Sequence, residues 1–149
     1  MKNTNIVFET KYFTLERHPK PFVCRTEGGH LRIFPKDHTI SERRELTKEQ
    51  ANEFMELSII AGEALEKAMN EQGIPVVKIN YEDLGNWAFK RGERPVLHLH
   101  IFGRATNAVH QVFPEAVYLP DRSSGFYDSF VALTDEDIAA IQKHLKTPR

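Results

Sequence analysis

Within the stretch from Pro95 to Gly103, residues 97–101 alternate between apolar and polar side chains, a pattern typical of a β-strand that is buried on one face only. Successive side chains of a strand point to opposite faces of its sheet. The apolar set, Leu97, Leu99 and Ile101, is therefore expected to face a core. His98 and His100 then stand side by side on the open face. The pattern predicts a sheet that is covered on one face and carries two imidazoles on the other.

Two helices are indicated by their capping signals. The longer one is predicted over residues 48–72, because Thr47 and Gln50 have the spacing of a capping box and Gly73 follows the last apolar position. A second helix is predicted after Thr134, where an acidic first turn complements the helix dipole. Short stretches rich in β-branched and aromatic residues predict strands at residues 6–8, 12–16, 30–34, 76–81 and 96–102. This order predicts an α+β fold with an antiparallel sheet of about five strands.

Length and charge limit the classes of function. A chain of 149 residues is expected to form a single domain, 1–149. Its 20 Lys and Arg residues against 21 Asp and Glu residues give a net charge of -1, so we expect neither nucleic acid nor a membrane surface as a partner. The single cysteine, Cys24, and the lack of a signal-peptide pattern or a long apolar run predict a cytoplasmic protein.

The histidine pair is compatible with several chemistries. Two imidazoles on one rigid strand can bind a metal, hold an anion, supply a nucleophile beside a hydrogen-bond donor, or be an unremarkable polar pair. A zinc site needs a third and usually a fourth ligand. Residues that could supply them, none at a diagnostic spacing, are His38, Asp37, His30 and His110. The metal site therefore stays a minor alternative.

A phosphate site is suggested by residues on either side of one predicted loop. Asn80 lies at the end of the strand before the loop, and the basic run Lys90–Arg94 precedes the histidine strand. Arg91 can make charge-assisted bonds to phosphate, and Gly92 beside it would let the backbone approach a ligand closely. We therefore expect Arg91 to favour substrates with extra phosphates. The competing interpretation is a solvated loop in which Arg91 and Arg94 pair with Glu93, Asp83 or solvent.

Two segments together resemble the histidine triad (HIT) family. Gly28–His38, followed by Ser41, Leu46, Thr47 and Glu49, is similar to the family's strand that ends in Pro-Lys-x-His before its long helix. His98–Arg104 is similar to the end of its His-φ-His-φ-His-φ-φ signature, where φ is apolar, with Val96 at the position of the first histidine. The resemblance spans roughly Phe8 to Arg104. It implies a HIT-like fold and a homodimer that pairs through the long helix and the following strand.

The resemblance also implies a function and a set of site residues. His98 would attack the α-phosphorus of a nucleotide conjugate, such as a phosphoramidate or dinucleoside polyphosphate, with its ring held by the carbonyl of Val96. His100 and His38 would support the anionic pocket. Substrate contacts are expected from Asn80, Leu15, Arg91 and Gly92, with no cofactor or metal. The remaining histidines, His18, His30, His110 and His144, are predicted to be structural or surface residues.

Two other function classes remain open. Val96 and the altered loop are compatible with a nucleotide-binding or interaction module that has lost turnover. A nucleotidyltransferase, in which a second phosphate compound replaces water, is also compatible with the same residues.

Overall fold

The computed structural model describes residues 3–145, within which five antiparallel strands form one sheet in the spatial order β1-β2-β3-β5-β4. The strands are β1 (Ile6–Glu9), β2 (Phe13–Arg17), β3 (His30–Pro35), β4 (Val76–Asp83) and β5 (Leu99–Ala105). The helices are α1 (Lys48–Glu71) and α2 (Asp135–Leu145), with short 3-10 helices η1 (Arg25–Glu27), η2 (Arg43–Glu45), η3 (Asn86–Arg91) and η4 (Arg122–Ser124). The α+β fold predicted from the sequence is confirmed. None of the described helices is long and apolar enough to cross a bilayer.

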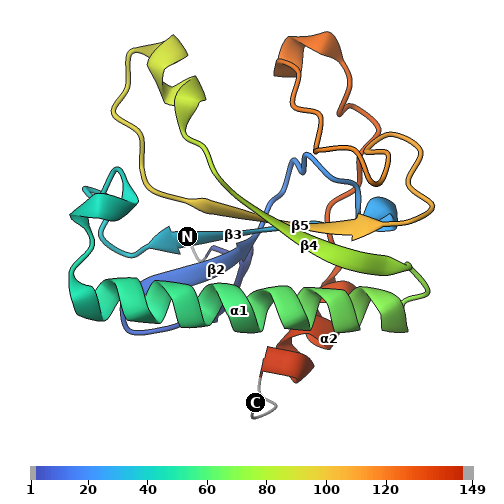
Figure 1. Cartoon of the computed structure of the whole chain (residues 1–149), viewed down its shortest axis with the longest axis horizontal. Coiled ribbons are helices and arrows are strands. Elements are labelled where there is room, and N and C mark those ends of the chain that lie inside the picture. Colours follow the sequence, from blue (N-terminus) through green and yellow to red (C-terminus); the bar gives the residue numbers. More distant parts are fainter. Residues whose placement is uncertain (1–2, 146–149) are drawn as a thin grey trace.

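Helix α1 covers one face of the sheet, and its start follows the predicted capping box (Figure 1). The hydroxyl of Thr47 accepts a hydrogen bond from the backbone N–H of Gln50 at 3.1 Å, and the Gln50 side chain accepts one from the N–H of Thr47 at 2.9 Å. Helix α2 begins in the same reciprocal way, through Thr134 and Asp137. Side chains of both helices join the main core with the apolar side chains of the strands.

The alternation in β5 places its two sets of side chains as predicted. Leu97, Leu99 and Ile101 belong to the core beneath α1, whereas His98 and His100 lie on the opposite face. The strand itself begins at Leu99, three residues later than predicted. The reason is that the backbone N–H of Leu97 donates to the carbonyl of Ile40 at 2.9 Å, outside the ladder between β4 and β5.

Two segments rise from the open face of the sheet (Figure 1). The first, which we call the η3 arm, comprises residues 84–96 between β4 and β5. The second, the C-terminal arm, comprises residues 106–134 between β5 and α2. Regular structure in the C-terminal arm is limited to η4, but the arm is anchored by buried polar side chains. Glu27 accepts hydrogen bonds from the backbone of His110 and Gln111, and Arg104 donates to the carbonyl of Glu115 at 2.7 Å.

Candidate active site

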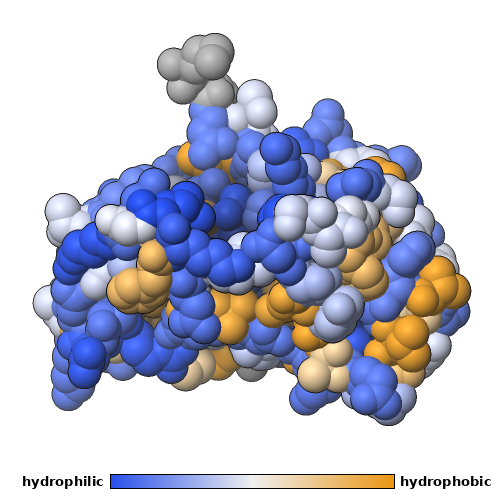
Figure 2. Space-filling view, turned by 90° about the horizontal axis from the view of Figure 1, so that it is seen from above, coloured by the Kyte–Doolittle hydropathy of each residue, from blue (hydrophilic) through white to orange (hydrophobic). Residues whose placement is uncertain are grey.

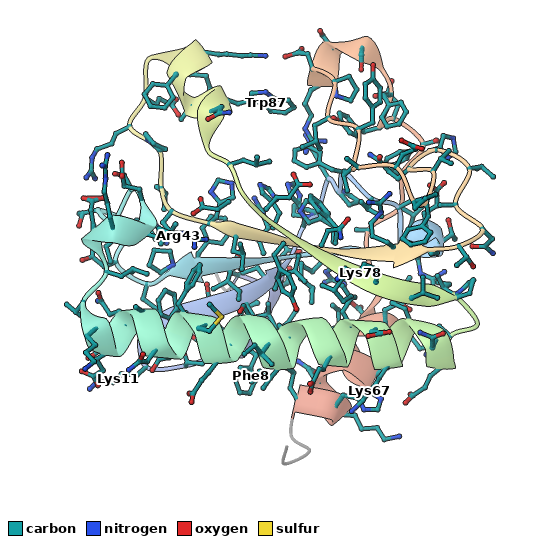
Figure 3. The ribbon with its side chains drawn as sticks, viewed as in Figure 1. Phe8, Lys11, Arg43, Lys67, Lys78 and Trp87 are labelled. Carbon is teal, nitrogen blue, oxygen red and sulfur yellow. The ribbon has the colours of Figure 1, made fainter. Side chains whose placement is uncertain are left out.

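A cavity of about 520 Å³ lies between the two arms, above the open face of the sheet. This volume is in the range of small-molecule sites. Its floor contains His98 and His100. One side, which we call the apolar wall, comprises Leu84, Trp87, Ala88 and Pro95. The other side, which we call the charged wall, comprises His18, Arg32 and Arg122. Trp87 projects from the η3 arm into the space between the arms (Figure 3), and the surface seen from the side of the arms is largely hydrophilic (Figure 2).

The ring of His98 is held in one tautomer. Its Nδ1 lies 2.8 Å from the carbonyl oxygen of Val96, and because a carbonyl can only accept, Nδ1 carries the proton. The ring also stacks on Phe34, with 5.3 Å between centroids. Burial lowers the pKa of His98 below its ordinary value, so the ring is neutral at pH 7. Nε2 therefore keeps a free lone pair, which is what a nucleophile needs.

His100 is held in the opposite tautomer through a second buried histidine. The backbone N–H of Phe22 donates to Nδ1 of His30 at 3.0 Å, so neutral His30 carries its proton on Nε2. That Nε2 lies 2.8 Å from Nδ1 of His100 and donates to it. Burial lowers the pKa of His100 to about 3 and that of His30 well below its ordinary value, so both rings are neutral. His100 therefore carries its proton on Nε2, where it can serve as a hydrogen-bond donor.

His18 is a third histidine whose tautomer is determined by the backbone. The N–H of Lys20 donates to its Nδ1 at 3.0 Å, which leaves the proton on Nε2. Burial lowers the pKa of His18 to about 2, and the positive charges of Arg32 and Arg122 act in the same direction. The charged wall therefore combines one neutral donor with two cations.

The residues predicted from the sequence are only partly brought together. The cavity is lined by His98, His100 and Arg91, and the Nε of Arg91 donates to Glu93 at 3.0 Å. Four other predicted site residues do not line it: Leu15, His38, Asn80 and Gly92. Leu15 is fully buried in the core beneath α1, because strand alternation turns it away from the open face. His38 is exposed on the loop after β3, and Asn80 accepts a hydrogen bond from Arg104 at 2.7 Å.

Two of the histidines that were predicted to be structural or surface residues, His18 and His30, lie at the candidate site. His18 lines the cavity, and His30 is bonded to a residue of the floor. For His30 a signal was present in the sequence, because period-two alternation in β3 puts it on the same face as Arg32 and Phe34. Arg122 was missed for a different reason, since its position depends on how the C-terminal arm folds back over the sheet.

The His-x-His pair gains no further metal ligands in the described part of the chain. Among residues 3–145, no group of three or more His, Cys, Asp or Glu side chains is arranged to hold a metal ion. The site is instead built from neutral imidazoles whose protons are placed by backbone groups and by one another.

Comparisons with solved structures agree on the fold. The chain is similar in structure to a histidine triad protein from Bradyrhizobium japonicum (TM-score 0.65, 18% identity, covering 94% of this chain and 89% of that one). A histidine triad protein from Marinobacter aquaeolei gives a TM-score of 0.63 at 20% identity, covering 95% and 85%. A uridylyltransferase mutant gives 0.55 at 19%, covering 97% of this chain but 44% of that one. No curated protein matches the chain.

At such identities these structures establish the fold alone, and the family is established by sequence. The model of the HIT domain matches residues 1–107, which include β1 to β5, α1, His98 and His100. Residues 108–145 continue the chain beyond the matched region and supply Arg122 of the charged wall. With a matching family model over most of its length, this chain belongs to the HIT family of histidine triad proteins.

Proposed function

We propose that this protein is a nucleotide hydrolase that cleaves the α-phosphate linkage of a nucleotide conjugate through a covalent nucleotidyl-histidine. The observation that carries the proposal is the pair of complementary tautomers in the cavity floor. His98 offers a lone pair on Nε2, because Val96 accepts the proton of its Nδ1. His100 offers a proton on Nε2, because His30 donates to its Nδ1. A nucleophile next to a donor is the arrangement that attack on a phosphoryl group requires.

In the first step, Nε2 of His98 attacks the α-phosphorus and forms an N–P bond. The bond between phosphorus and the leaving group breaks, and the leaving group takes that electron pair and then a proton from water. The new positive charge on the His98 ring is stabilised by the bond from Nδ1–H to the Val96 carbonyl. His100 donates from Nε2 to a non-bridging oxygen, on which negative charge accumulates in the transition state.

In the second step, water attacks the phosphorus of the adduct and the N–P bond breaks. His98 recovers its lone pair, and the water gives up a proton to solvent. Aromatic side chains near the floor offer a surface on which the nucleobase of the substrate can stack. Trp87 of the apolar wall lies edge-on to Phe22 with 5.7 Å between ring centroids, and a stacked base is a common partner for such side chains.

The experiment that tests this function is a search for the adduct. The full chain is incubated with adenylyl and guanylyl phosphoramidates and dinucleoside polyphosphates, quenched, and analysed by intact-mass spectrometry. We expect a mass increase of one nucleotidyl group in the wild type, its absence in His98→Ala, and slower formation in His100→Ala. A full-rate adduct in His98→Ala would contradict the proposal, as would activity that a chelator abolishes and zinc restores. Adding a phosphorylated acceptor distinguishes hydrolysis from transfer.

We also propose a homodimer that pairs through α1 and the edge strand β4. Met55 of α1 is apolar, but it is 57% exposed. Tyr81 of β4 is 47% exposed, and its hydroxyl lies against Gly62, which helical spacing places on the same flank of α1 as Met55. A second copy would cover this flank. Sedimentation at micromolar concentration should give about twice 17.2 kDa, and a 17.2 kDa particle would contradict the dimer.

A further inference from the structure

The four arginines that line the cavity differ in whether a carboxylate neutralises them. Arg91 is paired with Glu93 at 3.0 Å, and Arg94 is paired with Glu45 at 3.0 Å. Arg32 and Arg122 form no ion pair with any of residues 3–145. The unneutralised positive charge is therefore confined to the charged wall.

Arg32 is half-buried on β3, and its Nε has no hydrogen-bond partner among the described residues. Glu16 lies opposite it on β2 and raises its pKa, but burial has the larger effect and lowers that pKa. The Glu16 carboxylate accepts a hydrogen bond from the hydroxyl of Thr14 at 2.9 Å instead of forming an ion pair with the guanidinium. That guanidinium lies 4.8 Å from the ring centroid of Phe34.

Arg122 reaches the cavity from the C-terminal arm. One of its nitrogens, Nη2, donates to the carbonyl of Lys20 at 2.7 Å, and the guanidinium lies 4.4 Å from the ring centroid of Phe22. The carbonyl of Lys20 accepts this hydrogen bond, but it does not neutralise the positive charge of the Arg122 guanidinium. Burial lowers the pKa of Arg122, as it does that of Arg32.

Each of these guanidiniums packs on an aromatic ring that contacts a floor histidine, and Arg32 is also the direct partner of His100 in the pairing of β3 with β5. Arg32 lies over Phe34, which stacks on His98, and Arg122 lies over Phe22, whose centroid is 5.6 Å from that of His100. The two cations therefore lie beside the floor, Arg32 next to His100 and Arg122 across the ring of Phe22. Two guanidiniums that face no carboxylate can hold one phosphate group in addition to the phosphate that His98 attacks.

A partly buried cation without a counter-ion is costly, and an anionic ligand removes that cost. Arginine's planar fork matches phosphate, to which it can make two charge-assisted hydrogen bonds. We propose that His18, Arg32 and Arg122 form a second anion site that holds a phosphate of the substrate other than the one attacked by His98. The choice of a nucleotide as the molecule carrying both phosphates rests on the proposed function.

Binding of uncleavable ligands tests the inference without any need for turnover. Calorimetry on the full chain compares a nucleoside 5′-monophosphate with two ligands that carry a second phosphate, the 3′,5′-bisphosphate and the α,β-methylene diphosphate, in adenosine and guanosine forms. We expect at least one doubly phosphorylated ligand to bind about tenfold or more tightly than the monophosphate. This advantage should fall to about twofold or less in Arg32→Gln and in Arg122→Gln, and be partly retained in Arg32→Lys.

Arg91→Gln is the matched control variant, because it alters a cavity arginine that is already paired with a carboxylate. Loss of the advantage in Arg91→Gln alone would overturn the inference, and so would an equal affinity of the wild type for all three kinds of ligand. Equal weakening of every ligand in Arg32→Gln would also overturn it, since Arg32 would then hold the reacting phosphate. Circular dichroism confirms that each variant is folded. The adduct on His98 is measured separately, so the two proposals can fail independently.

Discussion

The two faces of the sheet are completed by different parts of the chain. The covered face is closed by α1, whose apolar positions pack on Leu97, Leu99 and Ile101. The open face is completed by three separate segments. These are the residues after β2 that include His18 and Phe22, the η3 arm, and the C-terminal arm. Within β5 and the residues just before it, a side chain on one face contributes to stability, and the next one contributes to the site. We therefore expect that stability and chemistry can be altered separately in this short segment.

The largest effect is expected for His98→Ala on the open face. Loss of the nucleophile should reduce the rate of adduct formation by about 10³-fold or more, equivalent to about 4 kcal/mol of barrier. The free energy of unfolding should change much less, because His98 is outside the main core. Quenched-flow measurement of the adduct, with urea unfolding of the same variant, checks both. A folded His98→Ala protein with wild-type turnover would remove the distinction between the faces.

Ile101→Ala makes the converse change on the covered face. Ile101 is fully buried, and its truncation leaves a cavity that should cost about 2–5 kcal/mol of unfolding free energy. The folded fraction should still form the adduct at a rate near that of the wild type. Urea unfolding gives the first quantity, and adduct formation per folded molecule gives the second. A large loss of rate in folded Ile101→Ala would show that the two faces are coupled.

The buried histidines of the open face predict a dependence of stability on pH. Burial lowers the pKa of His18 to about 2 and of His100 to about 3, whereas an unfolded histidine titrates near 6.5. Below pH 6.5 the unfolded state therefore binds more protons than the folded state, and stability falls as the pH falls. Each such histidine contributes about 1.4 kcal/mol to the loss between pH 7.5 and pH 5.5.

Urea unfolding at these two pH values measures this loss, and His18→Gln should reduce it by about 1.4 kcal/mol. The pKa values of the carboxyl groups of Glu27 and Asp137 lie below their ordinary values, so these groups titrate below this window. An unchanged pH dependence in His18→Gln would mean that His18 is accessible to protons in the folded state.

The smallest effect is expected for Val96→His. The partner of His98 at this position is a backbone carbonyl, which is present whatever the side chain. The rate of adduct formation should change by about twofold or less. A large gain in that rate would indicate that a side chain at position 96 takes part in the chemistry of the floor.

The covered face and the charged wall also differ in how well the sequence predicted them. The capping box at Thr47 and the alternation around Ile101 are local patterns, and both are confirmed. The charged wall depends on contacts between distant residues. Gln111 donates to the carbonyls of Phe22 and Tyr118, and these contacts help to hold the C-terminal arm that carries Arg122. No local periodicity encodes such contacts.

Arg91 illustrates a limit of another kind. Its residue type and the neighbouring Gly92 led to the prediction that Arg91 binds phosphate, and Arg91 does line the cavity. Composition cannot distinguish an arginine that faces Glu93 from one that faces no carboxylate, because the distinction lies in side-chain geometry. The proposal for the charged wall depends on that distinction.

The ion pair between Lys90 of η3 and Asp121 at the start of η4 joins the two arms at 2.8 Å. Both side chains are about half exposed, so the pair contributes little and salt weakens it further. Salt weakens this link between the arms, and it also screens the attraction of Arg32 and Arg122 for an anionic ligand. We therefore expect association of an anionic ligand to slow as ionic strength rises.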